Sequence, residues 1–283
     1  MNIIPLTGVL GAEILDADVT NESRFQQIFE AFVKYSVIAI RDQHISPEQL
    51  IRFAQQFGDI NVNRFFTPHP KYPEIAMVVK EPHQKVVLGG GWHTDNSYDD
   101  APCRCSILHA NEVPSIGGDT GFASMSAVFD TLSESMKTFL RGLWANHSAH
   151  RNFSYSAQGA AEYEDGRIRN PELATQEALH PVVIKHPLSG KECLFVNLGF
   201  TTHIANLHRG ESKNILKFLY GHGSDIRFTY RINHLPGTIT IWDNQATWHR
   251  AIDDYNGDRR VMHRISVEGV PLKPSRATKQ STP

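Results

Sequence analysis

The sequence has little cysteine, no excess of charge of one sign and no long apolar run. Its 28 Lys and Arg residues stand against 30 Asp and Glu residues, which gives a formal net charge of −2. Proteins that bind nucleic acid or anionic membranes need clustered Lys and Arg, and no dense basic run is present. We therefore expect no nucleic-acid partner and no membrane partner, and a small molecule as the substrate.

The three cysteines do not form the framework of a disulfide-rich protein. They are odd in number, and Cys103 and Cys105 would share one strand face, so we expect them and Cys193 to be buried thiols. No apolar run approaches the roughly 18 residues that cross a bilayer. The first residues also lack the basic and apolar regions of a secretory signal. These absences predict a soluble, cytoplasmic protein.

What is present is an ordinary globular composition with 40% hydrophobic residues, enough for a sizeable core. Near the N-terminus, a helical apolar stripe predicts a helix over residues 22–34: Phe25, Ile28, Phe29, Phe32 and Val33. The β-branched run at 36–40 predicts a buried strand. Ser46, with Gln49 three residues later, predicts the capped start of a second helix that ends at Gly58.

Beyond residue 70 the pattern changes to short strand-like runs separated by Gly, Pro, Asn and Asp: 75–79, 104–110, 119–123, 180–185, 193–197, 226–232, 238–242 and 261–267. Many short strands with few helices predict a mainly β fold with flanking helices, a double-stranded β-helix or jelly roll. We expect a single domain over residues 1–272. Within it, the polar, aperiodic segment 145–178 is expected to form a lid insertion, and residues 273–283 to form a disordered tail.

The run Trp92-His93-Thr94-Asp95 carries the sharpest local signal for chemistry. On a strand, residues i and i+2 point to the same face, so this imidazole and this carboxylate converge. A second imidazole from a distant strand would complete a 2-His-1-carboxylate triad, which leaves open positions on iron(II). His249 is the candidate. Taken alone the triplet is weak evidence, because a surface or core His and Asp pair arises by chance in many chains.

Arg260 and Arg264 follow His249 in a strand-like run, and on a strand they share one face. An exposed cationic strand face is one interpretation. The other is that a guanidinium captures a carboxylate in bidentate fashion, as the distal carboxylate of 2-oxoglutarate beside a chelated iron would need. The two arginines are about 13 Å apart at the strand rise, too far to hold one small carboxylate. Arg264 therefore needs its own anion, either an internal Asp or Glu or a ligand.

Together these motifs resemble the taurine dioxygenase and 2,4-dichlorophenoxyacetate dioxygenase family of iron(II)- and 2-oxoglutarate-dependent oxygenases. The similarity runs nearly end to end and includes residues 5–14, 92–95, 117–120, 194–202 and 242–264. It implies an enzyme that uses Fe(II), 2-oxoglutarate and O2 to hydroxylate a small anionic substrate, with release of succinate and CO2. It also implies a homo-oligomer, a dimer or higher.

Carried over residue by residue, the resemblance implies that His93, Asp95 and His249 bind the iron. It implies that Arg260 and Thr120 bind 2-oxoglutarate. It further implies substrate contacts for five positions that have the residue types of the taurine enzyme: His69, Tyr72, Phe153, Phe200 and Arg264.

One departure concerns the substrate. The taurine enzyme has a substrate-contacting asparagine shortly before the His-x-Asp motif, where this chain has Gly89-Gly90-Gly91. The glycines remove a polar contact and add backbone freedom. We therefore expect an acid larger than taurine or of another shape, among the sulfonates, carboxylates, sulfate esters and aryloxy acids.

Two rival functions fit part of these observations. Two His and one Asp can bind zinc in a hydrolytic or non-catalytic metal protein on the same fold. A sensor could hold an acid without turning it over. Arg260 and Thr120 argue against the zinc hydrolase, which has no need of a dicarboxylate clamp, and succinate release would separate an oxygenase from the sensor.

Overall fold

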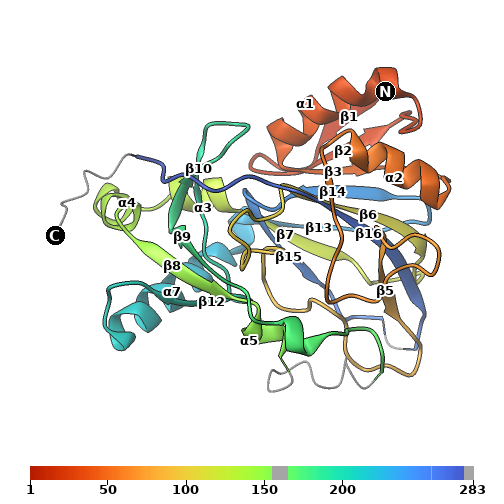
Figure 1. Ribbon diagram of the computed structural model, residues 1–283. Helices are drawn as coiled ribbons and strands as arrows, with labels where there is room; N and C mark the ends of the chain where they lie inside the picture. The colour runs from red at the N-terminus through yellow and green to blue at the C-terminus, as the bar shows by residue number, and fades with distance from the viewer. Residues whose placement is uncertain (155–164, 256, 277–283) are drawn as a thin grey trace.

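The protein is described here by a computed structural model that covers residues 1–154, 165–255 and 257–276 (Figure 1). Within these ranges, no helix combines the length and the apolar character needed to cross a membrane. All three cysteines are buried and free, which confirms the prediction made from their number and spacing.

A large sheet of eight strands forms one wall of the molecule. Its order is β1-β2-β3-β14-β6-β16-β4, and β5 also pairs with β16. Only β2 and β3 pair in parallel within this sheet. The strands are β1 (Asn2–Pro5), β2 (Ala12–Leu15), β3 (Val37–Ile40), β14 (Ile239–Asp243), β6 (Cys105–Glu112), β16 (Arg260–Val267), β4 (Ile60–Asn61) and β5 (Ala76–Lys80).

A smaller sheet packs against the inner face of the large one (Figure 1). Its antiparallel order is β13-β7-β15, with β13 (Thr229–Ile232), β7 (Thr120–Ser124) and β15 (Thr247–Ala251). Side chains from both sheets meet in one buried cluster that contains Phe122, Trp242 and Met262. Two mainly antiparallel sheets closed over a shared core form the jelly roll that the strand pattern predicts.

Two helices cover the outer face of the large sheet, α1 (Phe25–Tyr35) and α2 (Pro47–Gln55). The predicted apolar stripe of α1 faces the sheet, and Ile28 and Phe32 are fully buried there. The predicted capping box of α2 is present, because Ser46 accepts from the backbone N–H of Gln49 while the Gln49 side chain accepts from the N–H of Ser46. Both helices thus form where the sequence predicts them, although α2 ends at Gln55 and not at the predicted Gly58.

A second group of elements lies beside the two sheets, at the left of Figure 1. It has a three-stranded sheet in the order β12-β8-β9 and a hairpin, β10-β11, with helices around them. The elements are α3 (Met125–Asp130), α4 (Glu134–Arg141), β8 (Trp144–Ser148), α5 (His150–Phe153), β9 (Glu177–Pro181), β10 (Val183–Lys185), β11 (Glu192–Leu194), β12 (Thr201–Ile204) and α7 (Arg209–Gly223).

The expected lid and tail differ in part from the structure. The ends of segment 145–178 belong to β8 and β9, which pair with each other, so this part is a strand pair. Residues 155–164 lie outside the described part of the chain. In the expected tail, Lys273 and Ser275 hydrogen-bond to β10, and residues 277–283 lie outside the described residues.

Candidate metal centre and adjoining cavity

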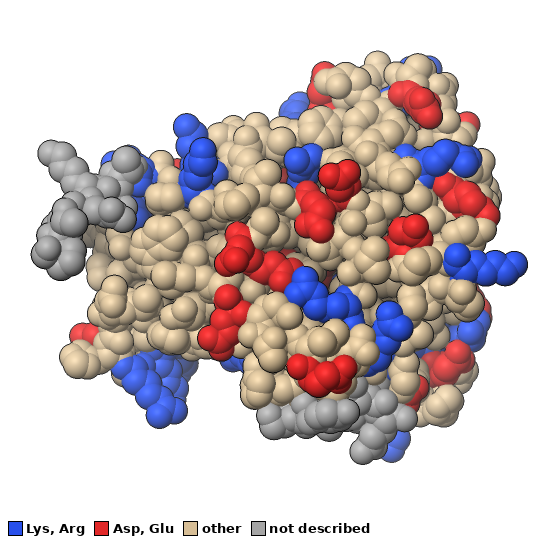
Figure 2. Space-filling model, in the orientation of Figure 1, with Lys and Arg blue, Asp and Glu red and all other residues tan. Residues whose placement is uncertain are grey.

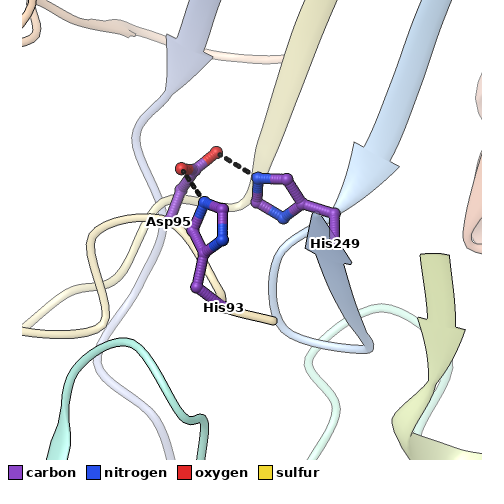
Figure 3. Close-up of side chains that lie close together, drawn as sticks. All are labelled: His93, Asp95 and His249. Atoms are coloured by element: carbon purple, nitrogen blue, oxygen red, sulfur yellow. Dashed lines mark ion pairs between the residues drawn. The ribbon is translucent and has the colours of Figure 1, made fainter. Parts of the chain in front are cut away.

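His93, Asp95 and His249 come together beside strand β15 of the smaller sheet (Figure 3). His249 lies on β15, and His93 forms an isolated antiparallel bridge to it. The backbone nitrogen of each residue lies 3.0 or 2.9 Å from the carbonyl oxygen of the other. The bridge gives His93 and Asp95 the alternation of a strand, which turns both side chains to one point. One ligand atom from each residue lies within 4.8 Å of the others.

The two imidazoles are neutral and face the carboxylate. Burial is the main cause that lowers the pKa of both His93 and His249. Nδ1 of His93 donates to the carbonyl oxygen of Gly91 at 2.8 Å, so its Nε2 carries the lone pair. The Nε2 atoms of His93 and His249 lie 3.7 and 3.6 Å from Asp95 oxygens.

Asp95 is an ionised carboxylate within this cluster. Burial would raise its pKa, but the Arg264 guanidinium and the Ser106 hydroxyl hold that pKa far below its usual range. Two neutral imidazoles and one carboxylate therefore bring one possible ligand atom each to within 4.8 Å of one another. This donor set fits an iron(II) ion and leaves its remaining positions open.

Arg264 has an internal anion, and that anion is Asp95. Its Nη1 lies 3.1 Å from Asp95 Oδ1, and its guanidinium stacks at 4.4 Å over the ring of Phe66. Nε of Arg264 is buried and has no hydrogen-bond partner among the described residues. Arg264 thus contacts the metal centre and retains donor capacity for a ligand.

Arg260 and Thr120 lie together in a small cavity of about 50 Å³ beside the triad. Arg260 is 5% exposed, and its Nε donates to the carbonyl oxygen of Gly118 at 3.1 Å. No carboxylate of residues 1–154, 165–255 or 257–276 forms an ion pair with it. The Thr120 hydroxyl lies 2.9 Å from Nε2 of His234. A buried guanidinium without a counter-ion can bind an anion strongly.

A larger cavity of about 720 Å³ opens on the other side of the triad, and Arg264 lines both cavities. Phe153 and Phe200 line the larger one, as the sequence predicts for substrate contacts. Phe66 and Tyr98 complete its aromatic wall. Its lining also contains glycines 89–91 and aliphatic side chains, together with two cations, Arg264 and Arg151, and several asparagines.

The structure does not bring His69 and Tyr72 to this cavity. The ring of His69 packs 5.4 Å from that of His263, which lies on the opposite face of β16 from Arg264. The hydroxyl of Tyr72 donates to Glu48 on α2. The cavity is lined instead by two residues that the sequence analysis missed, Asn63 and Phe66.

Asn63 and Phe66 have the same three-residue spacing as the predicted pair and lie six positions earlier. The resemblance that implied His69 and Tyr72 rests at these two positions on residue type alone. The signal that could have found Asn63 and Phe66 is their position soon after α2, because the short strand β4 that follows this helix leads directly to the cavity.

The three consecutive glycines Gly89-Gly90-Gly91 shape the backbone around His93. Gly89 has φ +75°, and a Cβ there would lie 3.1 Å from Cε1 of His93. Its carbonyl accepts from the N–H of Ala251 at 2.9 Å, which ties the segment to β15. Gly91 supplies the carbonyl that fixes the His93 tautomer. The glycines therefore let the backbone pass close to the imidazole and also form one wall of the larger cavity.

Known proteins share this arrangement of the chain. The model of the taurine catabolism dioxygenase TauD, TfdA family matches residues 2–266. An alkylsulfatase of Acinetobacter baylyi is 30% identical over 93% of this chain and 84% of its own. An alpha-ketoglutarate-dependent sulfate ester dioxygenase of Pseudomonas putida is 30% identical over 96% of this chain and 91% of its own. The crystal structure of a taurine dioxygenase from Burkholderia xenovorans superimposes with a TM-score of 0.79 at 27% identity, over 96% of this chain and 92% of that one.

Proposed function

The chain belongs to the TauD, TfdA family and is an Fe(II)- and 2-oxoglutarate-dependent dioxygenase, and we propose that its substrate is an organic anion with an apolar body. The match to this family confirms the family and the reaction class that the motifs predict. The identity of the substrate, and the residues that serve each reactant, are argued below from the contacts within the site.

His93, Asp95 and His249 are the proposed iron ligands. The observation that supports this is the convergence of two neutral imidazoles and one carboxylate within 4.8 Å. Iron(II) held there with 2-oxoglutarate and O2 supplies the oxidising power to replace an unactivated C–H with C–OH, as succinate and CO2 are released. The protein supplies ligation, orientation and a cavity that limits access of competing reactants.

Arg260 is the proposed partner of the distal carboxylate of 2-oxoglutarate, with the Thr120 hydroxyl beside it. Support comes from the burial of the Arg260 guanidinium and from its lack of a carboxylate partner in the described chain. Thr120 and Arg260 line the same small cavity as His93 and His249. A dicarboxylate chelated to iron at one end would fill that cavity with its other end.

Arg264 is the proposed partner of the substrate's anionic group, and Phe66, Phe153 and Phe200 are proposed to contact its apolar body. Arg264 lines the inner end of the 720 Å³ cavity, whose wall is mainly aromatic and aliphatic. A volume of that size exceeds what a two-carbon sulfonate such as taurine needs. Among the predicted acids, sulfate esters and aryloxy acids with a substantial apolar body fit best, and two similar proteins carry names that refer to sulfate esters.

We also propose that the enzyme is a cytoplasmic homo-oligomer, a dimer or higher. Three buried free thiols suit a reducing compartment. On the face that Figure 2 shows, acidic and basic side chains are interspersed, as suits a protein that recognises small molecules. Light scattering after size-exclusion chromatography would measure the assembly.

The proposed substrate class is tested by a screen for succinate formation. Metal-free enzyme is loaded with Fe(II) and supplied with O2, 2-oxoglutarate and one test acid at a time. Alkyl sulfates, alkyl sulfonates, aryloxy acids and taurine form the panel, and each acid is paired with its neutral alcohol or ester. Succinate formed above the substrate-free rate with the acids and not with the neutral partners supports the proposal. Equal rates with the neutral partners would refute it.

A further inference from the structure

A chain of hydrogen bonds leads from the core of the jelly roll to Asp95. Trp242 Nε1 donates to Asn244 Oδ1 at 3.0 Å. Asn244 Nδ2 donates to Ser106 Oγ at 3.0 Å. Ser106 Oγ donates to Asp95 Oδ2 at 2.7 Å. All four residues are at most 5% exposed.

The donor-to-acceptor direction of these hydrogen bonds is fixed by Trp242. An indole N–H can only donate, so it holds the amide oxygen of Asn244 toward Trp242. The amide nitrogen is then turned toward Ser106 and occupies one lone pair of the Ser106 hydroxyl. The single hydroxyl proton of Ser106 is left to Asp95, which as an ionised carboxylate can only accept.

Strand pairing holds these hydrogen-bonded residues in place. Ser106 on β6 is the register partner of Trp242 on β14 and of Ser266 on β16. The hydroxyl therefore sits on a central strand of the large sheet and cannot turn to water. This rigidity distinguishes Ser106 from Arg264, which contacts the other oxygen of Asp95 but is also the proposed partner of the substrate anion.

We propose that Ser106, oriented by Asn244 and Trp242, is a positioning residue that sets the orientation of the Asp95 carboxylate for metal binding. The inference rests on the proposed role of Asp95 as an iron ligand. Groups that hydrogen-bond to a metal ligand fix its orientation, and their loss costs about ten- to a hundredfold in metal affinity. When a substrate draws the Arg264 guanidinium away, the Ser106 contact is the one that remains on the carboxylate.

The test is a titration of metal-free enzyme with Co(II), followed by visible absorption without substrate or turnover. Ser106→Ala should bind Co(II) about ten- to a hundredfold more weakly than wild type. Ser266→Ala is the matched control, because Ser266 is a buried serine opposite Ser106 whose hydroxyl has no partner among the described residues, and it should bind Co(II) as wild type does. Ser106→Thr, which keeps a hydroxyl, should restore most of the affinity.

Asn244→Ala provides an independent variant in case Ser106→Ala fails to fold. It removes the donor to Ser106 Oγ and leaves the hydroxyl free to rotate, so it should weaken Co(II) binding less than Ser106→Ala does. Added to Ser106→Ala it should weaken binding no further. Wild-type affinity in Ser106→Ala, or independent and multiplying losses in the double variant, would overturn the inference.

Asp95→Ala separates this inference from the proposed function. If Asp95→Ala loses Co(II) binding while Ser106→Ala keeps it, the ligand assignment stands and the role of Ser106 is refuted. If Asp95→Ala binds Co(II) like wild type, the ligand assignment itself fails, and the inference fails with it.

Discussion

Arg260 is a buried cation whose described contacts leave most of its donors for a ligand. Its Nε bonds to the carbonyl of Gly118, and no described carboxylate pairs with it. Arg260→Gln should therefore raise the Michaelis constant for 2-oxoglutarate about ten- to a hundredfold, because a charge-assisted hydrogen bond is worth roughly 1.5–3 kcal/mol. Steady-state kinetics with 2-oxoglutarate as the varied reactant measures the effect, and the Michaelis constant for the substrate should change far less.

Arg259 offers the matched control one residue away. It is half exposed and pairs with Glu81 and Glu112 on the surface. Surface ion pairs contribute little, so Arg259→Gln should leave both Michaelis constants near their wild-type values. A Michaelis constant for 2-oxoglutarate that stays unchanged in Arg260→Gln would show that another residue binds the distal carboxylate. Arg264 would be the first to test.

Arg264 is shared between the metal carboxylate and the substrate cavity, which makes its substitution informative in two ways. Arg264→Leu should raise the Michaelis constant of the anionic substrate about ten- to a hundredfold through the lost charge-assisted contact. Because it also removes a cation that competes for Asp95 Oδ1, iron binding should not weaken. Kinetics with the acid and with its neutral analogue, beside a metal titration, measure both effects. Metal affinity that falls together with substrate affinity would show that Arg264 only braces Asp95.

The sequence predicts the metal ligands better than it predicts the residues that line the cavity. The triad could be predicted, because its residue types and spacing are dictated by ligand chemistry. His69 and Tyr72 could not be separated from Asn63 and Phe66, because recognition in an apolar cavity imposes weak demands on residue type. Ser106 carries no sequence signal at all, since its role depends on the strand register that sets it opposite Trp242.

Among the elements, those with local signals were predictable and those that depend on distant pairing were not. Helix α2 begins at Ser46 because the capping box and Pro47 favour that start without any tertiary contact. Strand β8 reads as an aperiodic polar segment, since Asn146, His147 and Ser148 are polar and the last two are nevertheless buried. Its place is decided by pairing with β9 and β12, which no local pattern reveals.

An ion pair joins α4 to β11 and makes that junction sensitive to pH. Nε and Nη2 of Arg141 each donate to a Glu192 carboxylate oxygen at 2.7 Å, and this bidentate contact lowers the pKa of Glu192 to about 2. An unfolded glutamate has a pKa of about 4.3, so the folded state favours the charged form and the gain is complete at neutral pH. It is lost as pH falls from about 4 toward 2.

Glu192→Gln should accordingly lower the free energy of unfolding at pH 7 by about 1–2 kcal/mol, a figure reduced for partial solvent screening. The difference from wild type should shrink toward zero as pH falls to about 2, and urea unfolding at several pH values measures it. Glu134 pairs with Lys137 but is itself exposed, so Glu134→Gln is the control and should change stability by less than about 0.5 kcal/mol. A difference between wild type and Glu192→Gln that persists at low pH would contradict the ion-pair account.

For the molecule as a whole, the jelly roll explains why residues so far apart in sequence form one site. His93 and Asp95 precede β6, and His249 lies on β15, yet the bridge from His93 to His249 joins them beside the smaller sheet. β16 then carries Arg260 and Arg264 on its inner face, where both line the small cavity and Arg264 also lines the larger one. The strand count and lengths predicted this architecture, while the β12-β8-β9 sheet and helix α7, which extend it to the left in Figure 1, escaped prediction.

The central claim is that the triad holds iron while Arg260, across the small cavity, holds 2-oxoglutarate. The most direct measurement is a crystal structure of the enzyme grown without oxygen in the presence of Fe(II) and 2-oxoglutarate, with anomalous data collected at the iron edge. The account predicts one anomalous peak at about 2.0–2.2 Å from His93, Asp95 and His249, with the distal carboxylate of 2-oxoglutarate on Arg260 and Thr120. An iron peak elsewhere, or a distal carboxylate bound to Arg264 with Arg260 left unpaired, would contradict it.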